Sequence, residues 1–567
     1  MSSEIKICQN CRREFAVEPE DFDFYKKISV PPPTSCPECR LKRRLVWFNL
    51  SNLYKRKCDL CGEEKISMYP PGAPYRVYCF KCWWSDNWDP LKYGRDYDFS
   101  RPFFEQFNEL LHETPLLGLS LDFFTGETVS FNNYVGHLKN CYLLFWADFN
   151  EDCHHGFYLY QNKNLLDCSL LMFCESSYDL THAYKTNRCF SSRDIHESID
   201  CYFMKDSRNC QNCFASANLR NKKYHIFNKS YAKEDYFKEI KKWDLGSYRT
   251  YEKVKKLAGE HWKKFPPQPI FDDFAINCTG NRIYNSKNCK ECFEIQETEN
   301  SKYLLIMIDP TTEDCYDVSG WGQNLALSYD SGVVGGDSSE IKFCHDSGIN
   351  LYHAEYCKDS YGGNHQFGCV SVKKAKHCIL NKLYAEGEFS ELRGKIIKHM
   401  DEMPYKDKQG RIYRYGEFFP AEFSPHAYNE TMALKFFPVS RDEAVSENYR
   451  WREPDVREYA VTKKAADLPD HIKDADNGIL REIIGCIACS RGFKMTGFEI
   501  NFLRKMNLPL PRKCPFCRIG EKIDLWVKGS KLVKRTCGKC GTEFETPHRE
   551  EEVKYILCKK CYLEEVV

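Results

Sequence analysis

Sixteen cysteines follow the same spacing at the two ends of the chain. Near the N-terminus the order is C-x2-C-x24-C-x2-C-x18-C-x2-C-x17-C-x2-C, and near the C-terminus only the 18-residue gap changes, to 19. Two CxxC pairs can supply the four thiolates of a closed, tetrahedral structural zinc site. The pattern therefore predicts two structural Zn²⁺ ions at each end, four in all. The predicted ligands are Cys8, Cys11, Cys36, Cys39, Cys58, Cys61, Cys79, Cys82, Cys486, Cys489, Cys514, Cys517, Cys537, Cys540, Cys558 and Cys561.

Two other uses of these cysteines are less compatible with the sequence. Disulfides need an oxidising compartment, and Met1–Glu20 contains no apolar signal segment. An iron–sulfur cluster also uses four thiolates, but paired CxxC knuckles at this spacing favour zinc. Within each end, we expect the first CxxC to pair with the second and the third with the fourth, rather than a cross-braced arrangement. Each intervening loop is long enough to close one such site by itself.

The residues between the cysteines repeat as well. Cys8–Arg40 aligns without a gap with Cys486–Arg518, and both segments contain C-x2-C-x3-F and P-x-P-x2-C-P-x-C-R. This motif resembles the "probable zinc-ribbon" module of uncharacterised bacterial proteins. Phe498 and Leu503 depart from the Glu and Tyr of the N-terminal copy, but neither position is a metal ligand. The resemblance implies a zinc ribbon at each end and no activity.

The whole architecture also resembles a group of bacterial multi-zinc-ribbon proteins, some of which carry a family III CoA-transferase name. An enzyme of that family needs an α/β core, and this chain does not alternate helix and strand in that way. The chain also lacks G-x-x-x-x-G-K-[ST], G-x-S-x-G and H-E-x-x-H motifs. The sequence therefore favours a protein that is not an enzyme.

Composition narrows the class of protein further. The 567 residues carry 82 Lys and Arg against 81 Asp and Glu, so net charge gives no general signal for nucleic acid. Aromatic residues make up 15%, which indicates folded surfaces rather than disorder. No apolar run reaches the roughly 18 residues that span a bilayer. The 32 cysteines without a secretion signal predict a reducing, cytoplasmic location.

One segment has a strongly basic composition. Arg40–Lys57 holds seven basic residues and no acidic one, interleaved with Trp47, Phe48 and Tyr54. Cations beside aromatic rings suit a phosphate backbone with exposed bases. The alternative is a solvated linker between two zinc sites. The C-terminal counterpart, Arg518–Arg535, repeats the trend more weakly, with six basic and two acidic residues. The predicted nucleic-acid-binding residues are Arg40, Lys42, Arg43, Arg44, Lys55, Arg56 and Lys57.

The middle of the chain shows a 12-residue period. Cys189, Cys201, Cys213 and His225 are spaced by 12, and Asn or Asp precedes nine of the sixteen central cysteines. A recurring turn former followed by a small residue predicts stacked short strands, and therefore a β-solenoid with an inner cysteine ladder. Two such units would make one coil of about 24 residues. Cys210 with Cys213, and Cys289 with Cys292, could instead form a further metal site, but ladder positions in adjacent coils are favoured.

The expected fold is mainly β, with duplicated treble-clef or zinc-ribbon pairs flanking a duplicated solenoid. The expected divisions are tandem zinc ribbons at 1–90, an aromatic connector at 91–130, solenoid halves at 131–231 and 275–385, a helical linker at 232–274, a helix and connector at 386–480, and tandem zinc ribbons at 481–567. Helices are expected at Phe103–His112, Lys233–Lys242, Tyr248–Phe265 and Glu386–Met400, and a glycine-rich loop at Ser328–Glu340.

Three functions remain from the sequence. The first is binding of nucleic acid or a ribonucleoprotein through the zinc ribbons and the basic segment. The second is a protein-interaction scaffold with structural zinc. The third, least favoured, is a solenoid enzyme acting on carbohydrate or acyl groups. The third would need clustered acids and bases, for which the candidates are Asp148, Asp152, Asp179, Asp194, Glu197, His154, His155, His182 and His196.

Overall fold

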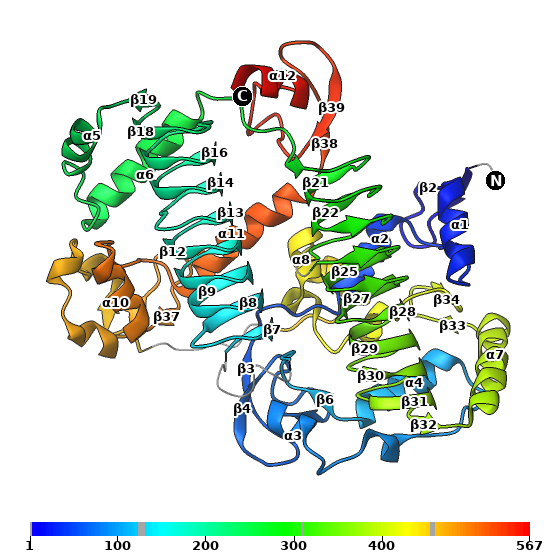
Figure 1. Ribbon diagram of the computed structural model, residues 1–567. Coiled ribbons are helices and arrows are strands. Elements are labelled where there is room, and N and C mark those ends of the chain that lie inside the picture. Colours follow the sequence, from blue (N-terminus) through cyan, green and yellow to red (C-terminus); the bar gives the residue numbers. More distant parts are fainter. Residues whose placement is uncertain (1–2, 123–130, 308–309, 454–459, 567) are drawn as a thin grey trace. The chain divides into compact units, whose positions relative to one another are not determined.

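The computed structural model describes residues 3–122, 131–307, 310–453 and 460–566. The chain divides into two compact units. Unit 1 contains residues 1–121 and 271–453, and unit 2 contains residues 122–270 and 454–567. Each unit therefore combines one cysteine-rich end with the solenoid half that is more distant in sequence (Figure 1). In the described ranges, no helix is long and apolar enough to cross a membrane.

The predicted β-solenoid is present in both units, but its coil is half as long as expected. In unit 2, Tyr142 pairs in parallel with His154, and Cys201 with Cys213, so one coil takes 12 residues and not 24. Every third residue from Phe131 to Phe227 has a positive φ. Each coil is therefore a square of four three-residue sides with a left-handed corner between them. Asn and Asp adopt this conformation more readily than most residues, which explains why they precede the cysteines.

The cysteines form the expected inner ladder. The Cys201 side chain is fully buried, and its thiol donates to the carbonyl of Ile199. Cys189 donates in the same way to the carbonyls of Asn187 and Ser198. Cys210 and Cys213 occupy neighbouring sides of one coil rather than adjacent coils, and neither belongs to a metal-binding group among the described residues. A thiol is small enough for this interior and can still satisfy a backbone carbonyl.

The strands of the unit 2 solenoid stack mainly in parallel (Figure 1). They are β7 Asn133–Gly136, β8 Tyr142–Asp148, β9 Glu151–Tyr160, β10 Lys163–Leu166, β11 Ser169–Met172, β12 Glu175–Tyr178, β13 Thr181–Tyr184, β14 Arg193–His196, β15 Ile199–Tyr202, β16 Lys205–Arg208, β17 Gln211–Phe214, β18 Lys223–Ile226 and β19 Lys229–Ser230.

The solenoid of unit 1 is less regular, with coils of 11 to 14 residues: Asp272 pairs with Ile283, Tyr361 with Lys373, Gly332 with His345, and Lys302 bridges Tyr316. Its strands are β20 Asp272–Asp273, β21 Gly280–Tyr284, β22 Cys292–Gln296, β23 Thr298–Glu299, β24 Thr312–Glu313, β25 Tyr316–Gly322, β26 Leu325–Ala326, β27 Tyr329–Gly335, β28 Ser339–Lys342, β29 His345–Glu355, β30 Tyr361–Phe367, β31 Lys373–Ile379 and β32 Lys382–Leu383.

The predicted loop at Ser328–Glu340 is wrong. Most of it is strand β27, whose residues are all buried. A Cβ atom on Gly335 would lie 2.3 Å from the carbonyl oxygen of Gly322, so glycine is needed where the backbones of neighbouring coils approach each other. Glycine here marks close packing of backbone rather than a turn.

Four helices occur where the sequence predicts them: α4 Phe103–Glu113, α5 Lys233–Ile240, α6 Tyr248–Trp262 and α7 Glu386–Glu402. Others were not predicted. Among these are α1 Pro19–Lys27, α2 Pro37–Leu45, α3 Phe80–Trp84, α8 Met432–Phe436, α9 Arg441–Ser446, α10 Gly497–Lys505, α11 Pro515–Gly529 and α12 Lys559–Val566. Helices α2 and α11 begin at the second CxxC of each end, and they lie against β25 and β27 of unit 1 and against β9 of unit 2, respectively.

Candidate metal centres

The first four cysteines converge from a hairpin and a helix. Strands β1 (Glu4–Ile7) and β2 (Glu14–Val17) pair antiparallel, and Cys8 and Cys11 lie in the turn between them. Cys36 is the N-cap of α2 and Cys39 lies in its first turn. A hydrogen bond from Cys39 lowers the pKa of Cys36 to about 5, against the opposing effect of burial. A thiolate at a helix N-terminus is also favoured by the helix dipole.

The sixteen terminal cysteines gather into four groups of four. In each group the four Sγ atoms lie within 4.8 Å of one another. The first CxxC pair joins the second and the third joins the fourth, which is the sequential pairing expected from the loop lengths. The Sγ atoms of Cys11 and Cys36, and of Cys489 and Cys514, are 3.7 Å apart. Metal–sulfur bonds of about 2.3 Å in a tetrahedron place sulfurs about 3.8 Å apart. The four groups can therefore hold metal ions with no position left for a substrate.

The second group at each end has the same construction. Cys58 and Cys61 lie between β3 (Tyr54–Lys57) and β4 (Glu64–Ser67), and Cys79 is the N-cap of α3. Burial raises the pKa of Cys58, but backbone N–H groups donating to its sulfur outweigh burial and lower that pKa to about 7. The C-terminal copy uses β38 (Val533–Thr536), β39 (Glu543–Thr546) and α12. The thiolate of Cys58 is thus stabilised before any metal charge is considered, whereas burial raises the pKa of Cys79 to about 11, so this second thiolate would need the charge of the metal.

Three of the predicted nucleic-acid-binding arginines are buried in ion pairs. The side chains of Arg40, Arg43 and Arg44 are only 2%, 9% and 1% exposed. Arg40 Nη2 lies 2.8 Å from an oxygen of Asp317, and Arg44 Nη1 lies 2.7 Å from an oxygen of Asp330.

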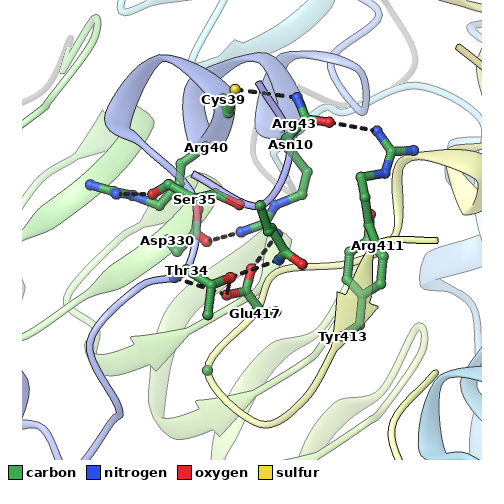
Figure 2. A network of polar contacts seen from close by, with 12 residues as sticks. Asn10, Thr34, Ser35, Cys39, Arg40, Arg43, Asp330, Arg411, Tyr413 and Glu417 are labelled. Carbon is green, nitrogen blue, oxygen red and sulfur yellow. Dashed lines mark hydrogen bonds and ion pairs between the residues drawn. The ribbon is translucent and has the colours of Figure 1, made fainter. Parts of the chain in front are cut away.

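Arg43 bridges two carboxylates, those of Asp330 and Glu417, at 2.8 and 2.6 Å (Figure 2). Together these pairs fix α2 to the solenoid of unit 1.

The prediction of a phosphate-binding surface at Arg40, Arg43 and Arg44 is therefore corrected. The segment lacks acidic residues because its counterions lie more than 270 residues later in the chain. Lys42 is largely buried and bonds to Glu447, whose carboxylate is 2.7 Å away.

The rest of the basic segment differs from this buried part. Arg56 pairs with Asp59 at 2.8 Å. Lys55 and Lys57 are exposed. The segment does not present its cations together, so the structure does not bring the seven predicted residues to one surface.

Unit 2 contains the corresponding contacts. Arg518 and Lys522 are the counterparts of Arg40 and Arg44 in the aligned repeat. Arg518 bonds to Asp167 and, at 2.8 Å, to Glu499 of α10. The ammonium group of Lys522 lies 2.6 Å from an oxygen of Asp179. Burial raises the pKa of Asp179, but the charges of nearby lysines outweigh burial and lower it. Each terminal module is thus attached to its solenoid by buried ion pairs.

The possible catalytic carboxylates do not form a common site. Each occupies a different position in the 12-residue coil, so the solenoid directs them to different faces or corners. Asp152 accepts a hydrogen bond from Asn140, and Asp179 binds lysines. His154 stacks on Phe498, and burial lowers its pKa to about 3. The described residues of unit 2 show no groove of acids of the kind a glycosidase requires.

The sequence did not predict a row of aromatic rings that lies along one edge of the unit 2 solenoid. His137, Phe149, Tyr160, Phe173, Tyr184 and His196 lie in sequence along the coils, and their ring centroids are 4.2, 5.9, 6.0, 5.6 and 6.1 Å apart from one ring to the next. We name this set the aromatic row. Phe149 is 43% and Phe173 is 39% exposed. The 24-residue spacing of Phe149 and Phe173, which equals two coils, is the feature of the sequence that could have predicted this row.

Comparison with known proteins adds no family to these observations. No protein-family model matches the chain. No curated protein matches it either. The function must therefore be inferred from the sites themselves.

Proposed function

We propose that the chain is a non-enzymatic protein-interaction scaffold whose four cysteine groups bind structural zinc in ribbon-like modules. The closed four-thiolate geometry supports a structural role, because a catalytic zinc site keeps one position for water or substrate. The hairpin-and-helix construction of each group is typical of treble-clef and zinc-ribbon modules. Zinc would hold α2 and α11 in the orientation that lets their basic residues reach the solenoid.

The aromatic row is the observation that favours binding of another protein. Phe149 and Phe173 project from a rigid solenoid edge, and exposed aromatic residues are enriched in the centres of protein interfaces. Charged groups also touch the row: Asp148 lies 3.0 Å from His137, and Lys185 lies over the Tyr184 ring. A strip of aromatic rings on a rigid edge suits an extended peptide segment.

The same observations favour protein over nucleic acid. Binding of single strands combines aromatic stacking with cations that release counterions from phosphate. Arg40, Arg43 and Arg44 are already committed to buried carboxylates. Lys55 and Lys57 are the residues of the original set that remain exposed. Nucleic-acid binding therefore becomes the second proposal, with a smaller surface than the sequence suggested.

The test is selection of binding peptides from a random display library on the zinc-loaded protein. Counter-selection uses a variant carrying Phe149→Ser and Phe173→Ser. The matched control is Phe274→Ser, which removes a phenylalanine that is 82% exposed and lies outside the aromatic row. We expect peptides that bind the wild type and the control but lose at least tenfold in affinity for the double variant.

Random RNA and DNA oligomers provide the second arm, measured by fluorescence anisotropy through a salt titration. Peptide enrichment that is unaffected by the double variant would refute the aromatic row as the binding surface. Oligonucleotide binding that falls steeply with salt, and is lost when Lys55 and Lys57 become glutamine, would instead support the nucleic-acid function.

A further inference from the structure

A fifth group of possible metal ligands lies in unit 2, away from the sixteen terminal cysteines. His155 and Asp167 occupy corners of neighbouring solenoid coils, and Glu499 comes from α10 of the C-terminal module. One ligand atom of each residue lies within 4.8 Å of the others. All three side chains are 2% exposed or less. The group therefore joins two parts of the unit that are more than 300 residues apart in sequence.

Several polar atoms in this group have no hydrogen-bond partner. Both ring nitrogens of His155, one oxygen of Asp167 and one oxygen of Glu499 are buried and unsatisfied. Arg518 takes the other oxygen of each carboxylate. Buried polar groups are normally satisfied, and buried charges are normally paired or bound to metal. An unsatisfied imidazole whose Nδ1 lies 3.3 Å from the unsatisfied oxygen of Asp167 indicates a missing ligand.

The equivalent place in unit 1 is fully satisfied and provides an internal comparison. His154 and His155 correspond to Lys302 and Tyr303, because each pair lies one coil before the corner aspartate. The Lys302 ammonium binds both oxygens of Asp21 in α1, at 2.9 and 3.1 Å. Unit 1 therefore places its own cation against the carboxylate of the terminal module.

In unit 2 the solenoid has no lysine at the corresponding position, and Glu499 is bound by Arg518 instead. Asp21 aligns with Glu499, which retains the carboxylate. At the position of Lys302, unit 2 has His154, and at the position of Tyr303 it has His155. The two carboxylates of the group share the single guanidinium of Arg518, and Lys522, whose charge also acts on Asp167, is paired with Asp179. From these contacts we propose that His155, Asp167 and Glu499 bind a divalent metal ion, zinc by the chemistry of the ligands.

The distances fit ligands of one ion better than direct hydrogen bonds. His155 Nδ1 lies 3.3 Å from Asp167 Oδ1 and 4.0 Å from Glu499 Oε1. A charge-assisted hydrogen bond would be about 2.7–2.9 Å. Two nitrogen or oxygen ligands on one tetrahedral zinc ion, with bonds of about 2.0–2.2 Å, lie about 3.3–3.6 Å apart. Because Glu499 Oε1 also accepts from Arg518, the unsatisfied oxygen Oε2 is the one that would serve as the third ligand.

This ion would fasten the C-terminal module to its solenoid. Its ligands come together only when α10 reaches the coils, so metal binding and docking are one event. The ion would do in unit 2 what Lys302 does in unit 1. The three ligands leave a fourth position that a buried water could fill, and the ion's role in the proposal is to hold α10 against the coils.

The test counts metal ions on the intact zinc-loaded protein by native mass spectrometry. We expect five ions per chain in the wild type. A variant with His154→Lys and His155→Tyr copies the unit 1 arrangement, so it should fold and carry four. The control His353→Lys changes a half-exposed histidine elsewhere, and should retain five.

Cobalt substitution gives a second measurement that does not depend on the variant folding. Four Co²⁺ equivalents bound by thiolates produce intense sulfur-to-metal charge-transfer bands, whereas the fifth should bind without adding to them. Five ions in the wild type and four in the grafted variant support the site. Four ions in a fully folded wild type, with every cobalt equivalent adding to the thiolate bands, would overturn it.

Discussion

Replacing Asp317 by asparagine tests whether buried ion pairs, rather than the cysteine groups alone, hold α2 on the solenoid. The Asp317 carboxylate is fully buried and accepts from Arg40 Nε at 2.9 Å and from Arg44 Nη1 at 3.2 Å. Asparagine keeps the shape but removes the charge that neutralises Arg40. Leaving a buried charge uncompensated costs about 3–5 kcal/mol. We expect opening of α2 to become more favourable by roughly two to three orders of magnitude.

Hydrogen exchange of the α2 amides measures this opening directly, which avoids assuming that a two-unit chain unfolds in one step. The matched control is Glu391→Gln, which breaks a 2.5 Å pair with Lys395 on the exposed face of α7 in the same unit. Exposed helical pairs of this kind contribute about 0.3–0.5 kcal/mol. Combining Asp317→Asn with Arg40→Met should restore part of the loss, because neither charge is then left alone.

A cost for Asp317→Asn below about 1 kcal/mol, indistinguishable from the exposed control, would refute the reasoning. The arginines would then be held loosely, and their assignment to phosphate binding would return. A large loss in the single variant that the double variant does not reduce would show instead that the shape of the site, and not its charge balance, is limiting.

Three further outcomes are expected. Removing zinc with a strong chelator should speed hydrogen exchange of the amides of α2 and α11 while the solenoid coils stay protected, because small metal modules depend on their ion for folding. Simultaneous loss of protection in the coils would contradict this. Glu197 has a positive φ of 50° at an exposed corner. In thermal unfolding, Glu197→Val should therefore lower the free energy of unfolding by about 1–2 kcal/mol, and Glu197→Gly should hardly change it. Equal effects of the two substitutions would argue against strained corners. Burial raises the pKa of Glu355, but Lys342 and Arg393 outweigh burial and lower it from 4.5 to about 2. The stability that Glu355 gains from these two cations, about 3 kcal/mol in all, is therefore present above pH 4.5 and is lost as the pH falls toward 2. In urea titrations, the stability of Glu355→Gln should depend less steeply on acid pH than that of the wild type.

The local features of the chain could be predicted because they depend on short spacing. Each cysteine group is built from two CxxC pairs, and a hairpin and a helix start are enough to bring them together. The inner cysteine ladder followed from the 12-residue period for a similar reason, since each coil pairs only with the next one. The length of the coil was wrong because a period of 12 fits either half a coil or a whole one. The positive φ at every third residue decides between them, and that is a property of the backbone.

By itself, then, the sequence determined the four cysteine groups, the solenoid and the positions of α4, α5, α6 and α7, all of which arise from contacts between neighbouring residues or neighbouring coils. The tertiary structure decided which solenoid half receives which terminal module, and with it the role of the basic segment. Arg40 has no counterion within its own segment, and its partner Asp317 becomes visible only when the two are brought together. The group of His155, Asp167 and Glu499 likewise exists only in the folded unit. Electrostatic pairing acts through space, so a run of charges cannot reveal whether its counterions belong to the solvent, to a ligand or to the same chain.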